Sequence, residues 1–311
     1  MKKILLIIVI LITGISVSGQ QDAMYTHYMF NTLAINPAYA GSRNALTATG
    51  LYRSQWVGLD GAPTTQTFTL HSPLFNDKIG LGLSVLNDKI GPINTTAIYA
   101  DFAYKLKLNE KAKLSFGLKG GINLMQGNIN SINVDQSNDN AFSNNIESDL
   151  LPNFGFGVYY YTNKWYVGLS TPKLLENNYG NNTSVGGTNL TSEQRHYFLI
   201  AGSVFDLNTQ GSIKLKPTTF VKVTNGAPIE ADLTAMIILQ DKFELGAMFR
   251  TGDALGLLLG YNFSKQLRFG YSFDWSFGNK TFTYNNGSHE VMLRYDLIFK
   301  EEAKITSPRY F

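Results

Sequence analysis

Few residues in this chain have the types and spacing that enzymatic chemistry requires. The four histidines are far apart and match neither the H-x-x-x-H nor the HExxH pattern of zinc sites: His27, His71, His196 and His289. The chain has no cysteine, which excludes disulfides, cysteine-ligated metals and thiol catalysis. No G-x-S-x-G nucleophile elbow occurs. We therefore expect no enzymatic activity, no cofactor and no metal.

Two local patterns resemble binding loops and are better interpreted as structure. In the acidic stretch after Asp135, Asn140 stands where a calcium loop needs glycine, and Glu147 comes one residue late. This stretch is predicted to be a solvated loop. The G-x-G steps lie inside predicted strands rather than before a helix, which favours close backbone approach or bending over phosphate binding: Gly80, Gly82, Gly155, Gly157, Gly246, Gly256, Gly260 and Gly270.

The elements that position these residues are strands, because apolar side chains recur at every second position almost throughout the chain. In residues 290–299, for example, the odd positions are apolar and the even positions are mostly polar. About fourteen such segments follow one another: 45–56, 64–72, 79–87, 95–106, 112–124, 153–162, 164–170, 195–206, 213–223, 229–239, 242–250, 253–262, 266–276 and 288–299. The fold class is therefore all-β.

Two all-β architectures compete, a soluble sandwich or propeller and a transmembrane antiparallel β-barrel. The segments run to about ten residues, which is the length of a tilted membrane strand. Aromatic residues gather toward segment ends, and the connections 125–152, 171–194 and 277–287 are long whereas those on the opposite side are mostly tight turns. These features predict a barrel of about 14 strands in the cell outer membrane. An even strand number places both termini in the periplasm.

The polar faces of the strands then point into the lumen, where positive and negative charges nearly balance. The cations there are Arg53, Lys105, Lys113, Lys119, Lys222, Arg250, Arg268 and Arg294, and the anions are Asp101, Glu230, Asp232, Glu244, Asp274, Glu290 and Asp296. This balance suits a cross-linked ion-pair network, although scattered solvated charges in a wet channel remain the alternative. The net charge of +3 falls to +1 without Lys2 and Lys3, so we expect no nucleic-acid partner.

The chain outside the barrel divides into three segments. Residues 1–19 have the charged start, apolar run and small-residue end of a cleaved signal peptide. Residues 20–44 form a pre-barrel segment too aromatic for a free tail, predicted to dock on or in the barrel as a plug-like or periplasmic element. Residues 45–299 form the barrel. Residues 300–311 form a periplasmic C-terminal tail, which is either a handle for a partner or a frayed end.

Motifs spread over nearly the whole mature chain resemble the PorP/SprF family of the type IX secretion system. The series begins with Asn-Pro-Ala-Tyr-Ala-Gly at 36–41 and closes with Ser-Pro-Arg-Tyr-Phe at 307–311. Each motif is weakly specific alone, but their order together is a strong signal. The residues that carry the likeness are Asn36, Pro37, Tyr39, Gly41, Arg53, Gln55, Trp56, Pro63, Asp88, Gly91, Pro172, Arg195, Tyr197, Pro217, Pro228, Glu290 and Arg294.

The resemblance implies a barrel that helps to secrete a large adhesin or other type IX cargo, or anchors it at the surface through its C-terminal domain. Further partners implied are periplasmic secretion components, facing the Asn36–Ala38 segment and the tail, and the lipid bilayer with lipopolysaccharide. Residues assigned to partner contacts are Asp135, Asp139, Asn144, Asn177, Tyr179, Asn189, Phe282, Tyr284, Arg309 and Phe311.

Three other functions remain open at this stage. Some members of the family serve the core gliding and secretion machine, so this role is an alternative to a dedicated accessory for one cargo. An Asn-Pro-Ala segment before a fourteen-strand barrel also resembles fatty-acid channels, which predicts an apolar pocket inside the barrel. A general porin predicts an open, conducting lumen.

Overall fold

A computed structural model describes residues 24–74, 77–128, 146–179, 191–278 and 283–298. The predicted signal peptide at 1–19 and the C-terminal tail at 300–311 lie outside these residues. Among the described residues, no helix is long and apolar enough to cross a membrane.

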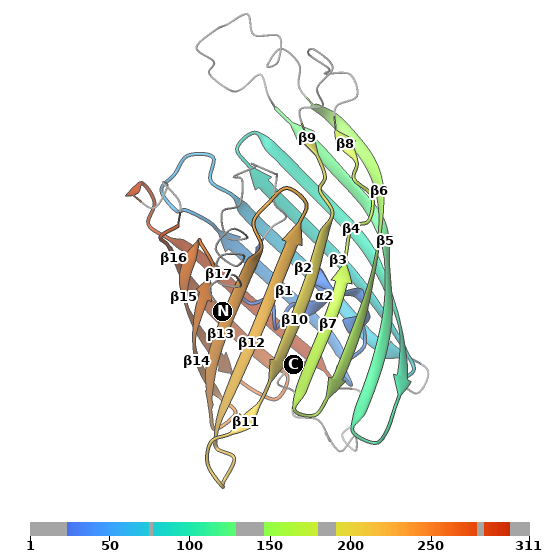
Figure 1. The fold of residues 1–311 in the computed structure, drawn as a ribbon, viewed down its shortest axis with the longest axis vertical. Helices are drawn as coiled ribbons and strands as arrows, with labels where there is room; N and C mark the ends of the chain where they lie inside the picture. The colour runs from blue at the N-terminus through green and yellow to red at the C-terminus, as the bar shows by residue number, and fades with distance from the viewer. Residues whose placement is uncertain (1–23, 75–76, 129–145, 180–190, 279–282, 299–311) are drawn as a thin grey trace, which may run out of the picture.

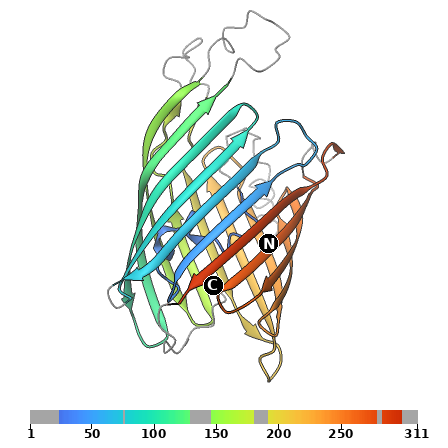
Figure 2. The same cartoon turned by 180° about the vertical axis from the view of Figure 1, so that it is seen from behind.

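The described chain forms one closed antiparallel β-barrel of fourteen long strands (Figure 1). These are β1 (Leu46–Ser54), β2 (Thr64–Leu74), β3 (Ile79–Ile90), β4 (Ile93–Lys107), β5 (Ala112–Gly127), β6 (Ile146–Thr162), β7 (Trp165–Thr171), β10 (His196–Ser203), β12 (Ile213–Thr224), β13 (Glu230–Leu239), β14 (Phe243–Arg250), β15 (Ala254–Asn262), β16 (Leu267–Ser276) and β17 (Ser288–Leu297). Neighbours in sequence pair with one another, and β1 pairs with β17 to close the ring (Figure 2).

The predicted fold class is confirmed, and several strand boundaries differ from those predicted. β5 and β6 are longer than predicted, because the two strands keep pairing beyond the apolar stretch, up to Gly127 and Ile146. The predicted strand 195–206 is divided, because Val204 N donates to Lys164 O outside the ladder and β11 (Phe205–Asp206) follows. A separate pair, β8 (Asn178–Tyr179) with β9 (Thr191–Ser192), lies in the longest described connection.

Alternation of burial along the strands separates a lipid-facing side from the lumen. In β14 every second residue is exposed, and the exposed ones include Phe243, Leu245 and Phe249. Aromatic pairs mark the edges of this apolar belt: at one end of β14, Phe243 packs on Tyr261 with ring centroids 4.9 Å apart, and at the other end Phe249 stacks on Phe277 at 6.2 Å. Such girdles are typical of barrels whose outer surface contacts lipid.

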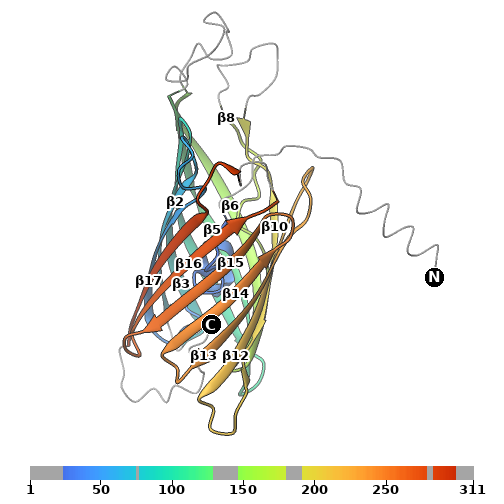
Figure 3. The ribbon, with the colours of Figure 1, turned by 90° about the vertical axis from the view of Figure 1, so that its left-hand side faces the viewer.

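The two ends of the barrel differ in their connections. At the end where β1 begins, here called the turn end, most strands are joined by short turns such as 108–111, 163–164 and 240–242. At the opposite end, the loop end, longer connections span 55–63, 128–145, 172–195 and 277–287. The long strands β5 and β6 rise furthest at the loop end (Figures 1 and 3). This asymmetry matches the one predicted from the sequence.

Candidate functional site

The lumen is occupied by the segment that precedes β1. Residues 24–45, here called the plug, contain the short helix α2 (Thr32–Ile35) and the 3-10 turn η1 (Pro37–Tyr39), both inside the barrel (Figure 3). All plug residues except Ala34, Ser42 and Asn44 are buried. The plug therefore fills space inside the barrel that would otherwise be open.

Asn36 fastens the middle of the plug to the wall. Its side-chain amide donates to Val158 O at 3.2 Å and Leu169 O at 3.4 Å, and its Oδ1 accepts from Ala38 N at 2.9 Å. The last bond caps η1, which Pro37 begins with its fixed backbone angle. The Asn-Pro-Ala motif thus serves as a turn and an anchor at once.

Asn36 and Ala38 are fully buried. The expectation that the Asn36–Ala38 segment presents its side chains to periplasmic components is therefore wrong. The physical reason is that an aromatic and apolar segment is more stable inside the lumen than in water.

We expect Asn36→Ala to destabilise the plugged barrel by about 1–3 kcal/mol, because two wall carbonyls and one plug amide lose their buried partner. Urea unfolding of the purified protein in detergent measures this loss. Asn109→Ala is the matched control, since Asn109 also accepts two backbone bonds, at 2.9 Å each, but at an exposed turn. A similar loss in both variants would contradict the anchoring role of Asn36.

Glycines on the inner face of the wall make room for the plug backbone. A Cβ added at Gly80 would lie 2.0 Å from Ala40 O, at Gly117 2.1 Å from Ala38 N, and at Gly157 2.1 Å from Asn36 Oδ1. No side chain fits at such distances. Close backbone approach, one of the two interpretations of the G-x-G steps, is confirmed at Gly80 and Gly157.

At the loop end, the start of the plug joins an ion network around Arg53. The Arg53 guanidinium lies 2.8 Å from Asp274 and 3.3 Å from Glu290, and all three groups are buried. Glu290 also accepts from the backbone N–H groups of Thr26 at 2.9 Å and His27 at 2.7 Å. Residues of β1, β16, β17 and the plug are thereby joined through one pair of carboxylates.

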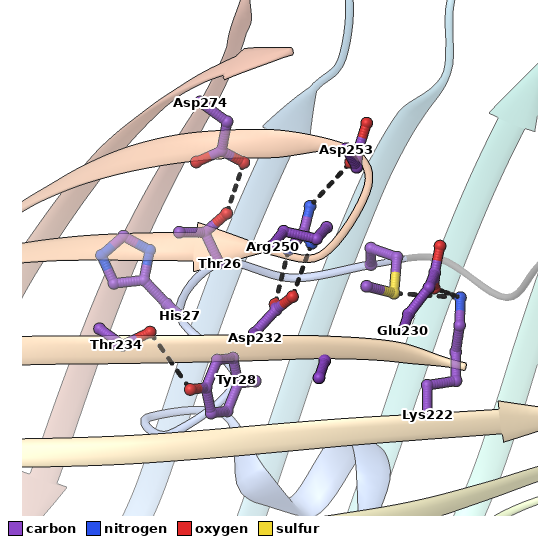
Figure 4. A network of polar contacts seen from close by, with 12 residues as sticks. Thr26, His27, Tyr28, Lys222, Glu230, Asp232, Thr234, Arg250, Asp253 and Asp274 are labelled. Carbon is purple, nitrogen blue, oxygen red and sulfur yellow. Dashed lines mark hydrogen bonds and ion pairs between the residues drawn. The ribbon is translucent and has the colours of Figure 1, made fainter. Parts of the chain in front are cut away.

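A second group of polar contacts lies beside it on β12, β13 and β14 (Figure 4). Arg250 forms a two-point contact with Asp232, at 2.9 and 2.8 Å, and Lys222 pairs with Glu230 at 2.5 Å. The Tyr28 hydroxyl of the plug lies within hydrogen-bonding distance of Thr218 and Thr234. Burial raises the pKa of Tyr28, so its hydroxyl stays neutral.

At the turn end, the last plug residues bind charged groups as well. Arg43 donates to Asp296 at 3.0 Å, and Lys105 Nζ donates to Gly41 O at 2.6 Å. Of the fifteen charges that the sequence places in the lumen, all except Lys113 and Glu230 are buried. Many of them pair with one another, as expected for a cross-linked network rather than for scattered solvated charges.

The family-motif residues gather in two places. Asn36, Pro37, Tyr39, Gly41, Arg53, Glu290 and Arg294 lie in the plug or on the wall around it. Gln55, Trp56, Pro63, Asp88, Gly91, Pro172, Arg195, Tyr197 and Pro228 lie at the loop end, and Pro217 lies within β12 near the turn end. The loop-end group is tied together by backbone bonds such as Gly91 N to Gly61 O at 2.9 Å and Gln55 N to Pro63 O at 2.9 Å.

Sequence reasoning did not identify Glu193, which organises the loop end. Its carboxylate accepts from the side-chain amides of Asn123, Asn153 and Asn177, the last two at 3.0 Å, and Lys173 Nζ lies 3.6 Å away. These residues belong to β5, β6 and the 172–195 connection. No local pattern could have shown this cluster, because it joins residues that are up to 70 positions apart.

We expect Glu193→Ala to loosen the 172–195 connection. Two buried amides and the half-buried amide of Asn177 lose a charged acceptor, which corresponds to about 2 kcal/mol and roughly a thirtyfold faster cleavage by an added protease. Limited proteolysis of the detergent-solubilised barrel measures the rate. Glu176→Ala removes an exposed carboxylate from the same connection and should leave the rate unchanged. Equal rates in both variants would show that Glu193 does not hold the connection.

Most residues assigned to partner contacts lie outside the described residues: Asp135, Asp139, Asn144, Asn189, Phe282, Arg309 and Phe311. Tyr284 is 75% exposed at the loop end. Tyr179 belongs to β8, and Asn177 is half-buried with its amide on Glu193. Among the described residues, no group of histidine and acidic side chains is arranged to hold a metal ion.

One apolar cavity of about 70 Å³ lies between the plug and the wall. Met24, Tyr28 and Ile35 of the plug form one side, and Phe198 and Phe220 of the wall form the other. Lys119, Lys173 and Lys222 are also in its lining. A pocket of this kind is what the channel alternative predicts.

A closed antiparallel barrel with an apolar outer belt, aromatic girdles and a polar, charged interior defines an outer-membrane β-barrel. The family model of the type IX secretion system membrane proteins PorP/SprF matches residues 17–295. The chain belongs to that family. The family resemblance expected from the motif series is thus confirmed.

Solved structures of other outer-membrane barrels are similar in outline. The monoaromatic hydrocarbon channel CymD has 11% identity and a TM-score of 0.48, with 90% of this chain and 94% of that chain covered. Omp33 of Acinetobacter baumannii has 10% identity and a TM-score of 0.46, covering 82% and 98%. A FadL homologue of Pseudomonas aeruginosa has 12% identity and a TM-score of 0.45, covering 84% and 92%. No curated protein sequence matches the chain.

Proposed function

We propose that this protein is a closed barrel that assists the secretion or surface anchoring of a large type IX cargo through the cargo's C-terminal domain. Family membership supports a role in this secretion system. The observation that carries the proposal is the plug, because a lumen filled by residues 24–45 and fastened through Asn36 and Arg53 suits an anchor better than a conduit.

In this proposal the loop end faces the outside, and the turn end, where β1 begins and β17 ends, faces the periplasm. The expected periplasmic position does not hold for the start of the plug, because Met24 lies near the loop end beside Lys222. Outer-membrane barrels have short periplasmic turns and longer external loops, and the connections of this chain follow the same division. The exposed Tyr284, together with the 172–195 connection held by Glu193, then forms part of the external surface that meets the cargo.

Deletion of the gene tests this role. We expect the dependent adhesin to disappear from the cell surface, as measured by antibody labelling and by protease treatment of intact cells. Complementation with Tyr284→Ala should restore less surface adhesin than the unchanged gene, whereas Tyr104→Phe, on the lipid-facing side, should restore it fully. The proposal fails if every type IX substrate is still displayed after deletion.

The apolar cavity favours a second candidate function, a channel for small hydrophobic solutes. This function requires the plug to move, since Met24 and Ile35 of the plug line the cavity. Uptake of a radiolabelled fatty acid by cells with and without the gene discriminates the channel from the anchoring role. Uptake that depends on the gene supports the channel, and unchanged uptake with lost adhesin display supports the anchor. A role in the core gliding machine instead predicts loss of all secretion.

A further inference from the structure

The turn end of the lumen holds more buried cations than buried carboxylates. Among the described residues, the cations are Arg43, Lys105, Lys216, Arg268 and Arg294, and the carboxylates are Glu244 and Asp296. Lys214, also buried there, pairs with the exposed Asp241 at 2.6 Å. The loop end differs, because each of its four buried cations has a carboxylate within 3.0 Å: Arg53, Lys119, Lys222 and Arg250.

Three of the turn-end cations meet at one aromatic ring of the plug. The Arg268 guanidinium carbon lies 3.5 Å from the centre of the Phe30 ring, Lys216 Nζ 4.2 Å and the Arg294 guanidinium carbon 5.8 Å. Arg268 and Arg294 are also directly opposite each other in the β16–β17 ladder, a position in which like charges repel. Arg268 pairs with Glu244, and Arg294 lies 3.7 Å from Asp296, a carboxylate that also binds Arg43. A ring face attracts cations only weakly, so the buried cations here still outnumber the buried opposite charges.

Neighbouring guanidinium groups are suited to an oxyanion, because each presents a planar fork of N–H donors. Arg268 uses one nitrogen for Glu244, and its Nε is buried without a hydrogen-bond partner. Buried cations are costly unless an opposite charge lies close by. We propose that the turn end of the lumen binds an oxyanion, a phosphate or carboxylate group, among Lys216, Arg268 and Arg294 beside Phe30.

Thermal unfolding of the purified full-length protein in detergent tests the site, with inorganic phosphate as the probe. At matched ionic strength, phosphate raises the unfolding midpoint more than chloride does. Lys216→Met weakens the apparent phosphate affinity by about tenfold, the usual effect of losing one charged hydrogen bond. Lys222→Met is the matched control, because this buried lysine lies at the loop end beside Glu230 and its loss leaves the phosphate dependence unchanged.

A second variant keeps the test decisive if Lys216→Met does not fold. Arg268→Lys retains the charge opposite Glu244 but lacks the planar fork, so the barrel folds and its phosphate affinity falls. Equal effects of phosphate and chloride on the unchanged protein would overturn the proposal, since screening alone would then explain them. A full phosphate response in Arg268→Lys together with one in Lys216→Met would overturn it as well.

A variant truncated after Lys300 distinguishes two sources of the oxyanion, a carboxylate of this chain and a soluble ion. The removed residues 301–311 carry the carboxylates of Glu301 and Glu302. A larger phosphate response in the shortened chain supports the site and identifies a carboxylate of this chain as its resident group. An equal response supports the site and identifies a soluble oxyanion.

Discussion

Replacing Gly117 by alanine is expected to turn a closed barrel into a conducting one. The new Cβ would lie 2.1 Å from Ala38 N and 2.5 Å from Ala38 Cα, both backbone atoms of η1. Because the overlapping atoms belong to the backbone, no side-chain rotation can relieve the overlap. The overlap therefore destabilises the state in which the plug occupies the lumen. Overpacking of this kind costs about 3 kcal/mol, which lowers the ratio of seated to unseated plug by about two orders of magnitude.

Planar bilayer recording measures this effect. The unchanged protein should give no stepwise current, and Gly117→Ala should give frequent openings. Gly50→Ala in β1 is the matched control, because a Cβ at Gly50 meets nothing within 4 Å. An electrically silent Gly117→Ala barrel, with the plug still protected from protease, would show that the plug does not close the lumen in the way inferred.

The second large effect is expected for Arg53→Met. This change leaves Asp274 and Glu290 buried without the Arg53 guanidinium. Glu290 keeps the backbone N–H groups of Thr26 and His27 and the His27 imidazole at 2.7 Å. Breaking a buried ion pair by removing one partner costs about 3–5 kcal/mol. Urea unfolding in detergent should therefore show a large loss of stability.

A double variant separates the charge from the packing. Arg53→Met combined with Glu290→Gln removes one cation and one carboxylate, so it should recover part of the stability lost by the single change. Arg195→Met is a control outside the lumen network, since Arg195 lies at the loop end and donates to Leu174 O. A loss below about 1 kcal/mol for Arg53→Met would mean that water in the lumen solvates these carboxylates.

The strands could be predicted from the sequence because alternation is a local property. The period-2 pattern places Arg53, Glu290 and Asp274 on the inner face without any knowledge of their neighbours. It cannot show that these three groups meet, because β1, β16 and β17 are joined only when the barrel closes. The family likeness supplied the role in secretion, which no residue pattern shows by itself.

The path of the plug was beyond sequence reasoning for the same reason. The aromatic residues and Pro37 predicted a docked segment, but nothing local indicates that Phe30 reaches Arg268 or that Asn36 reaches Val158 O. The inner glycines were the one signal that pointed to a close neighbour. Their positions in separate strands did not reveal which segment that neighbour was.

The order of the chain has a consequence for how the molecule is assembled. The plug comes before the first strand, and the ring is completed by the pairing of β1 with β17, the last strand. A completed ladder offers no gap through which α2 and η1 can enter sideways. Two carboxylates of the last strand bind the plug: Glu290 accepts from Thr26 and His27, and Asp296 accepts from Arg43. We therefore expect the plug to be in place before β17 pairs with β1, and its contacts to guide that last pairing.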